Sequence, residues 1–186
     1  DLGFQHHVCT TGQQTILAQE TCDQMKIYPD YELQAMIAGQ SLDLTIAKTI
    51  QQLHPIIQSF SPDWVVVHGD TTSCLGATLA AFYSKIKVAH VEAGLRSGHL
   101  TNPFPEESIR TIVDQLASVC FAPSAAAKAN LLKAGIDTSK IVLSGNTGID
   151  TLKQILPQLN HYIPLSIPVT LLSKIATNSR LLVITI

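Results

Sequence analysis

The chain has 186 residues, of which 46% are hydrophobic and 14% are charged, and its formal net charge is −2 at neutral pH. This length corresponds to about one domain of ordinary size, and the hydrophobic fraction predicts a sizeable core. The chain has 12 basic and 14 acidic residues, so there is no basic excess for binding a phosphate backbone or a membrane surface. This balance disfavours a nucleic-acid-binding protein and a membrane-surface protein.

Predicted strands and helices alternate along the chain, a pattern typical of a parallel sheet with helices on both faces. The clearest helix shows apolar residues at spacings of four and three, from Leu42 to Ile57. In chain order we expect a strand at 4–10, a helix at 14–25, an extended stretch at 31–36, a helix from 42 that ends at 61–63, a strand at 64–67, a helix at 72–83, a strand at 87–91, a helix at 106–116, a strand at 119–122, a helix from 125 to about 134, a strand at 141–143 and one more helix after 147.

Both ends of the chain suggest a piece of a longer protein. The first residue is Asp1 rather than Met, and the last six residues, 181–186, form an apolar run that indicates a buried strand. A strand cannot satisfy its own backbone groups, so we expect further chain beyond it. We predict one domain over 1–158 and a connector over 159–180.

Four cysteines are scattered without a C-x-x-C pair, which predicts free thiols in a reducing compartment and disfavours a zinc site. The chain does not open on a basic leader, and no uninterrupted apolar run reaches the about 20 residues of a membrane span. We therefore expect a cytoplasmic protein without a metal site.

Polar residues follow three of the predicted strands. Asp70 follows the strand at 64–67, Glu92 follows the strand at 87–91, and the segment 144–147 follows the strand at 141–143. Ligands of open parallel sheets bind beyond the carboxyl ends of the strands. Because Asp70 and Glu92 are one β-α-β step apart, we expect both at one edge of the sheet.

Structural roles compete with functional ones for these acids. Asp70 precedes a helix and could be its N-cap, while Glu92 could form an ion pair with Arg96. Glu106 and Glu107 open a helix, where two acids could simply offset the macrodipole.

His68 and His90 at strand ends could each be packed histidines bonded to the backbone. The sequence contains no G-x-S-x-G, G-x-G-x-x-G or P-loop motif, so a serine hydrolase and the common dinucleotide sites are disfavoured.

Several ordered motifs resemble the non-hydrolysing UDP-N-acetylglucosamine 2-epimerases. The likeness covers nearly the whole chain to about residue 156. The motifs are Thr11-Gly12-Gln13, Pro29-Asp30-Tyr31, Gly39-Gln40, His68-Gly69-Asp70-Thr71-Thr72, His90-Val91-Glu92-Ala93-Gly94-Leu95-Arg96, Pro105-Glu106-Glu107 with Arg110, and Gly145-Asn146-Thr147 with Ile149-Asp150.

The resemblance implies a Rossmann-like domain, one half of a glycosyltransferase-B type enzyme with two domains and the nucleotide sugar in the cleft between them. It also implies that the first strand of this domain is missing, which would leave an open sheet edge, and that 181–186 starts the second domain. The site would then be only half present, so we expect the fragment alone to be inactive.

The resemblance further implies that Asp70, Glu92 and Glu106 are the catalytic acids, with Asp70 and Glu92 also binding substrate. Gln13, Gln40 and Glu106 fit a regulatory site for a second UDP-GlcNAc. Gln14, Ile16, Gly39 and Ile109 depart from the residues usual in the family, and Ile16 and Gly39 do so at that regulatory site.

The implied reaction converts UDP-GlcNAc to UDP-ManNAc without a cofactor, in a protein that is a homodimer when complete. Because the C2 hydrogen of the sugar is not next to a carbonyl, the expected route is elimination of UDP and its re-addition, with acids and bases placed around one ring. The alternatives are a sugar transferase of the glycosyltransferase-B type and a non-catalytic remnant.

Overall fold

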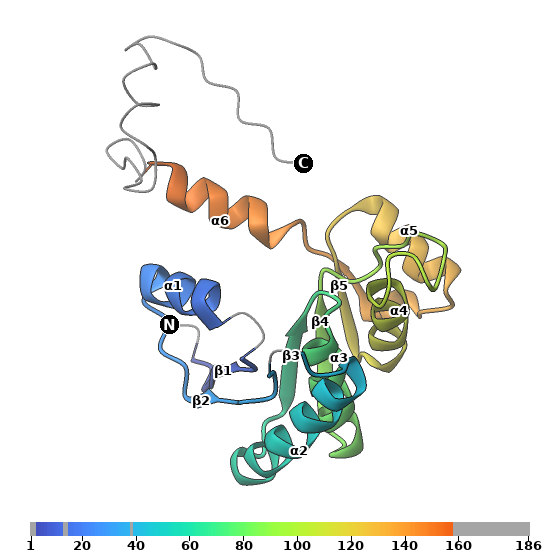
Figure 1. Ribbon diagram of the computed structural model, residues 1–186. Coiled ribbons are helices and arrows are strands. Elements are labelled where there is room, and N and C mark those ends of the chain that lie inside the picture. Colours follow the sequence, from blue (N-terminus) through green and yellow to red (C-terminus); the bar gives the residue numbers. More distant parts are fainter. Residues whose placement is uncertain (1–2, 13–14, 38, 158–186) are drawn as a thin grey trace. The chain divides into compact units, whose positions relative to one another are not determined.

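The computed structural model describes residues 3–12, 15–37 and 39–157. Strands and helices alternate through this part of the chain (Figure 1). The elements are β1 (Cys9–Thr10), α1 (Thr15–Met25), β2 (Tyr31–Glu32), α2 (Leu42–Phe60), β3 (Trp64–His68), α3 (Thr72–Tyr83), β4 (Lys87–Val91), α4 (Glu106–Leu116), β5 (Val119–Ala122), α5 (Ala125–Lys133), the 3₁₀ turn η1 (Thr138–Lys140), β6 (Ile141–Leu143) and α6 (Thr147–Ile155).

The larger sheet among the described residues is four-stranded and parallel, in the order β3-β4-β5-β6. His68 at the end of β3 pairs with Val91 at the end of β4, which in turn pairs with Phe121 in β5. Because neighbouring parallel strands end together, the loops after β3 and β4 emerge side by side. This register places Asp70 and Glu92 at the same edge, as the sequence predicts.

The strands β1 and β2 form a separate parallel pair, with Cys9 opposite Tyr31. Among the described residues, β3 therefore has a strand neighbour on one side only, which is the open edge that the resemblance implies. The side chain of Val66 on β3 is 67% exposed, although strands of parallel sheets are usually covered on both faces.

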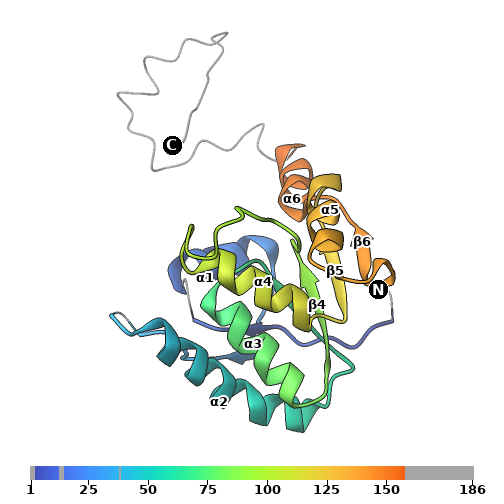
Figure 2. The same cartoon turned by 90° about the vertical axis from the view of Figure 1, so that its right-hand side faces the viewer.

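The helices α2, α3 and α4 lie on one side of the strands and α1 lies on the other (Figures 1 and 2). The helices α2 and α3 pack closely at Gly76 in α3, where an added Cβ would lie 2.7 Å from Cβ of Thr49 in α2. Leu53, Val67 and Val88 belong to the core cluster that these helices cover. Each such side chain contributes about 1.5–3 kcal/mol when fully buried.

The fold class is the predicted one, an α/β Rossmann-like arrangement of parallel sheets with helices on both faces. Helix and strand bounds agree closely with the prediction from β3 onward. The first strand is shorter than predicted: it covers 9–10 rather than 4–10, because its partner β2 offers only two residues for pairing.

The chain divides into two compact units, the first at residues 1–146 and the second beginning at Thr147. The predicted connector at 159–180 and the predicted strand at 181–186 lie outside the described residues. None of the described helices combines the length and the apolar character that crossing a membrane requires.

Candidate functional site

The two predicted acids at the sheet edge are neighbours. The N–H of Gly69 donates to the carbonyl of Val91 at 3.1 Å, which ties the loop after β3 to the end of β4. Oε2 of Glu92 lies 3.8 Å from the position that a Cβ on Gly69 would occupy. The carboxylate of Glu92 therefore rests beside the residue that precedes Asp70.

The backbone at Glu92 has a φ of +69°, a left-handed conformation that residues other than glycine seldom adopt. Its side chain is half-buried and makes no hydrogen bond or ion pair with the described residues. The alternative interpretation of Glu92 as the ion-pair partner of Arg96 is wrong, because Arg96 pairs with Asp114 instead.

The carboxylate of Asp70 is held by Arg110 of α4. Oδ2 of Asp70 accepts from Nε of Arg110 at 3.0 Å and from its Nη2, while Oδ1 has no partner in the described part of the chain. The N-cap of α3 is Thr71, whose hydroxyl accepts from the N–H of Cys74 at 3.2 Å. Asp70 is therefore not the cap that one interpretation of the sequence made it.

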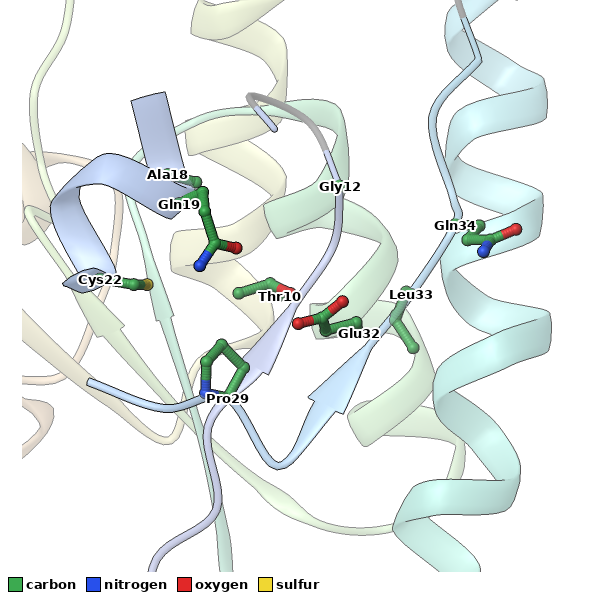
Figure 3. A pocket seen from close by; sticks show the side chains of 9 residues that line it. All are labelled: Thr10, Gly12, Ala18, Gln19, Cys22, Pro29, Glu32, Leu33 and Gln34. Atoms are coloured by element: carbon green, nitrogen blue, oxygen red, sulfur yellow. The ribbon is translucent and has the colours of Figure 1, made fainter. Parts of the chain in front are cut away.

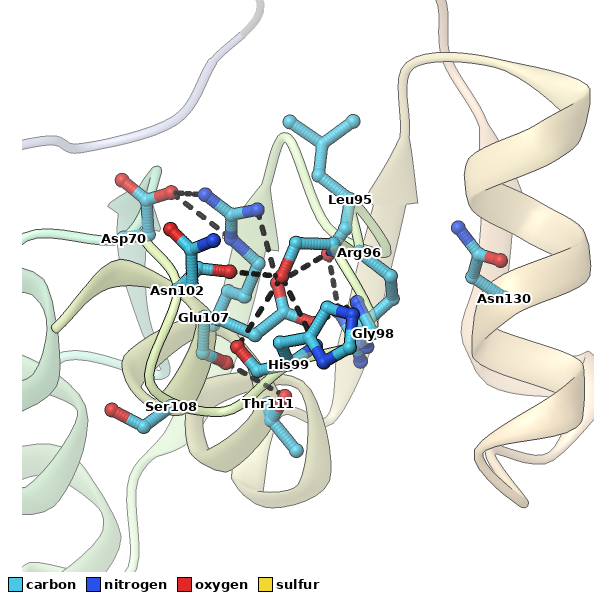
Figure 4. A network of polar contacts seen from close by, with 12 residues as sticks. Asp70, Leu95, Arg96, Gly98, His99, Asn102, Glu107, Ser108, Thr111 and Asn130 are labelled. Atoms are coloured by element: carbon cyan, nitrogen blue, oxygen red, sulfur yellow. Dashed lines mark hydrogen bonds and ion pairs between the residues drawn. The ribbon is translucent and has the colours of Figure 1, made fainter. Parts of the chain in front are cut away.

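Arg110 also connects Asp70 to Glu107, since its Nη1 donates to Oε2 of Glu107 at 3.2 Å. The Glu107 carboxylate accepts from the N–H groups of Ser97 at 2.9 Å and Gly98 at 3.1 Å. Figure 4 shows Asp70, Glu107 and Gly98 in one network. Glu107 thus anchors the loop after β4 to the first turn of α4.

The pKa of Glu107 reflects this environment. Burial by itself raises the pKa, but the hydrogen bonds from Ser97 and Gly98 and the charge of Arg110 outweigh burial. The pKa of Glu107 therefore lies below the usual range of a glutamate, and the ionised form is the one that the loop binds. Glu107 therefore does more than offset the macrodipole of α4.

Glu106, the residue next to Glu107, is in the opposite situation. Its Oε2 is buried and has no hydrogen-bond partner among the described residues. A buried carboxylate oxygen without a partner is costly, so it points to a ligand or a reacting group that completes its contacts. Since α4 starts at Glu106 and Arg110 of that helix holds Asp70, all three predicted acids belong to one end of the sheet.

A fully buried network lies directly beneath these acids. Nδ1 of His90 is 2.6 Å from Oδ1 of Asp114, and Nε2 of His90 is 2.9 Å from the carbonyl oxygen of Gly69. Oδ2 of Asp114 accepts from the N–H of Gly94 at 3.2 Å and lies 2.7 Å from Nη2 of Arg96, an ion pair outside hydrogen-bond geometry. His90 is thus a packed histidine bonded to the backbone, as the sequence predicts.

Gly94 links this network to α5. Its carbonyl accepts from Nδ2 of Asn130 at 3.0 Å. A Cβ at position 94 would lie 2.4 Å from the carbonyl oxygen of Ala127, so only glycine fits here.

The remaining predicted residues have mixed outcomes. The side-chain amide of Gln40 donates to the carbonyl of Ala35 and to Oγ1 of Thr45, both at 2.7 Å, and accepts from Nζ of Lys48 at 2.9 Å. Gln13 lies outside the described residues. Ser144 follows β6 and donates its N–H to the carbonyl of Ala122 at 3.0 Å, which places it at the same end of the sheet as Asp70.

The thiols in the core are free, as predicted. Cys74 and Cys120 are buried, while Cys9 and Cys22 are partly exposed. Burial and the nearby Asp70 raise the pKa of Cys74 to about 12, and burial and Asp114 raise the pKa of Cys120 to about 12. Neither thiol is a nucleophile near neutral pH.

The sequence interpretation missed Asp114 and the anchoring role of Glu107. A signal was present, because Glu107, Arg110 and Asp114 are spaced by three and four residues and share one helix face. Glu107 and Asp114 are buried beside Ile109 and Val113. A charged row on a buried helix face predicts a polar network, but only the structure identifies its partners.

A cavity of about 400 Å³ lies away from these acids, beside β1, β2 and α1. Its lining includes Thr10, Gln19, Cys22 and Glu32 (Figure 3). None of the three predicted catalytic acids lines this cavity.

Comparison with known proteins agrees with the motifs. A family model described as UDP-N-acetylglucosamine 2-epimerase matches residues 1–186. The UDP-N-acetylglucosamine 2-epimerase of Escherichia coli strain K12 is 44% identical over 149 residues, which are 80% of this chain and 40% of that relative. The enzyme of the same name from Neisseria meningitidis serogroup A is 41% identical over 152 residues, which are 82% of this chain and 41% of the relative.

Solved structures agree as well. The UDP-GlcNAc 2-epimerase from Neisseria meningitidis bound to UDP-GlcNAc superposes with a TM-score of 0.83 at 39% identity, covering 87% of this chain and 43% of that one. The Methanocaldococcus jannaschii enzyme in complex with UDP-GlcNAc and UDP gives a TM-score of 0.81 at 33% identity, covering 86% and 44%. The chain therefore spans less than half the length of the relatives it matches.

Proposed function

Because the chain belongs to the UDP-N-acetylglucosamine 2-epimerase family, we propose that the full-length protein interconverts UDP-GlcNAc and UDP-ManNAc. The observation that carries this proposal is the placement of Asp70, Glu92 and Glu106 at one end of the sheet. The unpartnered Oε2 of Glu106 adds a group that needs a ligand. Structures of relatives hold UDP-GlcNAc and UDP.

The proposed reaction proceeds in two halves. A base removes the C2 proton of the sugar as UDP leaves C1, which gives a 2-acetamidoglucal. UDP then adds back to C1 while an acid delivers a proton to the opposite face of C2, which inverts that centre. Each positioned acid or base contributes about 10²–10⁴-fold to the rate.

Asp70 and Glu106 are proposed to transfer the protons at C2. Glu92 is proposed to hold a sugar hydroxyl or to orient the other two acids. Arg110 fixes the direction of the Asp70 carboxylate, because it binds Oδ2 and leaves Oδ1 for the sugar ring. The first turns of α3 and α4 supply partial positive charge toward a departing diphosphate.

The rest of the substrate site is proposed to come from a second domain, since the relatives are more than twice as long as the matched part. Closure of the two domains would keep water from the glycal. The 186-residue chain alone should therefore show no turnover and only weak binding of UDP-GlcNAc.

The full-length protein is further proposed to be a cytoplasmic homodimer. A regulatory UDP-GlcNAc site at Gln13, Gln40 and Glu106 remains a prediction, and the three hydrogen bonds of Gln40 mean that a ligand there would have to displace an internal contact. Oε2 of Glu106, which has no hydrogen-bond partner among the described residues, is available to such a ligand.

The test is incubation of the full-length protein with UDP-GlcNAc in D₂O. We expect UDP-ManNAc to appear and deuterium to enter at C2 of both sugars. A sugar transferase of the same two-domain architecture would need an acceptor and would leave C2 unlabelled. A folded protein that gives neither product nor label would refute the proposal.

A further inference from the structure

The side chain of His90 is fully buried between a backbone carbonyl, which can only accept hydrogen bonds, and a carboxyl group, which accepts them when it is ionised. The His90 side chain is 0% exposed, as is that of Asp114. Nε2 faces the carbonyl oxygen of Gly69 at 2.9 Å and Nδ1 faces a carboxylate oxygen of Asp114 at 2.6 Å. A neutral imidazole carries one ring hydrogen and can satisfy only one of these acceptors.

The second hydrogen belongs to the histidine rather than to Asp114. The other carboxylate oxygen of Asp114 accepts from the N–H of Gly94 and lies 2.7 Å from Nη2 of Arg96. Both contacts favour the ionised carboxylate. Protonating Asp114 would place a neutral acid beside the Arg96 cation, so the hydrogen of the short contact stays on Nδ1.

The groups that face the ring from the neighbouring elements are consistent with a cation. Asp114 approaches from α4, and Arg96 lies behind it in the loop after β4. Cys74 of α3 stays a neutral thiol and donates to the same Gly69 carbonyl at 3.2 Å. Cys120 of β5 is likewise neutral and contacts the carbonyl of Asp114.

The carbonyl of Gly69 and the N–H of Asp70 belong to one planar peptide group. Fixing the carbonyl therefore fixes the plane from which Asp70 departs. Gly69 has a φ of +75°, so the chain turns sharply as it leaves β3, and the two donors from inside the molecule hold that turn.

We propose that His90 is an imidazolium ion that positions Asp70 by donating one ring hydrogen to the Gly69 carbonyl and the other to Asp114. His90 does not touch substrate; it acts through the peptide that leads to Asp70. That both ring nitrogens of His90 carry a hydrogen can be tested without any enzymatic activity, whereas the effect on catalysis rests on the proposed function.

The first test observes the ring hydrogens directly in the ¹⁵N-labelled full-length protein at neutral pH. We expect both ring nitrogens of His90 to carry a bonded proton that exchanges slowly with water. The exposed His99 serves as an internal reference. Through-bond correlations from the side chain assign the ring without any substitution, and an unprotonated ring nitrogen at His90 would overturn the proposal.

The second test uses two substitutions that keep different halves of the contact. The amide of His90→Gln can reach the position of Nε2 and donate to Gly69, whereas the amide of His90→Asn reaches only the position of Nδ1. We expect His90→Asn to lower kcat about 10²-fold with KM little changed, as for other misplaced groups. His90→Gln should recover much of that loss, and equal losses in the two variants would contradict a role through Gly69.

A double-variant cycle with Asp70→Asn tests whether His90 acts through Asp70. If His90 acts through Asp70, adding His90→Asn to Asp70→Asn should cost less than threefold more, and losses that multiply would refute the positioning role. If Asp70→Asn alone leaves kcat unchanged, the catalytic role proposed for Asp70 fails, while the ring-hydrogen measurement still decides the state of His90. Circular dichroism of each variant confirms that it is folded.

Discussion

Two layers of acidic residues at this end of the sheet differ in how many hydrogen-bond partners their carboxylate oxygens have. In the buried layer, Asp114 accepts from the N–H of Gly94 and contacts the side chains of His90 and Arg96. Glu107 accepts from the N–H groups of Ser97 and Gly98 and from the side chain of Arg110. In the rim layer, Oε2 of Glu106 is buried without a hydrogen-bond partner, and the side chain of Glu92 makes no hydrogen bond or ion pair, in both cases among the described residues. The comparison teaches that residue type and position on a helix do not decide the role of an acid, whereas its partners do.

The comparison predicts that substitutions at Glu92 in the rim layer, and at Asp70 beside it, lower catalysis strongly and lower stability less than substitutions in the buried layer. Asp70→Asn or Glu92→Gln in the full-length enzyme should lower kcat by at least about 10²-fold, because each removes a positioned acid or base or the group that orients it. Steady-state kinetics measure the loss, with urea unfolding as the control. A loss below tenfold would assign these acids to the scaffold.

In the buried layer, the largest stability effect is expected for Asp114→Asn. The substitution leaves the His90 ring and the Arg96 guanidinium without their shared counter-charge inside the protein. Breaking a buried ion pair in this way costs about 3–5 kcal/mol. Urea unfolding gives the free energy, and the exposed Asp63→Asn is the matched control, which should change it by less than about 0.5 kcal/mol.

A smaller effect on stability, which depends on pH, is expected for Glu107→Gln, with Glu106→Gln as the comparison variant. Losing the ionised acceptor of Ser97, Gly98 and Arg110 should cost about 2 kcal/mol at neutral pH. Because the pKa of Glu107 is lowered in the folded protein, this stabilisation is present above the ordinary glutamate pKa of about 4.3. It is lost as the pH falls through the lower folded value.

Unfolding measured between pH 7 and acid should therefore show the Glu107→Gln penalty shrinking as the pH falls. Glu106→Gln removes a carboxylate that lacks a partner and should leave stability unchanged or raise it. Equal penalties for the two variants would mean that the bonded and unbonded glutamates do not differ in the way the structure shows.

The smallest effect concerns the buried thiol next to the network. With a pKa of about 12, Cys74 is thiolate in only about one molecule in ten thousand at pH 8. A thiol reagent should label Cys22 in the native protein long before Cys74, as mass spectrometry of peptides would show. Rapid labelling of Cys74 would indicate that the buried layer opens readily.

The sequence predicted the sheet from β3 onward well, because those segments carry β-branched runs and clear helix caps. The hydroxyl of Ser124 accepts from the N–H of Ala127 as its position predicts. The first strand was overestimated, since strand length depends on how many residues the neighbouring strand offers, and no local pattern reports that number.

The candidate site was predicted in part. The edge at which Asp70 and Glu92 meet follows from parallel topology and needs no family resemblance. The choice of Asp114 over Glu92 as the partner of Arg96 depends on a contact across 18 residues of sequence, which local patterns do not contain. Thr71 is the cap of α3, while Asp70 is bound by Arg110 from 40 residues away.

Gly94 has a further consequence for how this protein can vary. An added methyl group there would collide with the backbone of α5, whereas Gly98 and Gly145 have open space around the same position. A saturation library should accept almost no replacement at 94 and some at the other two, where only the unusual backbone angle resists. Position 94 therefore limits how closely α5 can approach the strand ends, and the replacements tolerated there report whether this end of the sheet is correctly assembled.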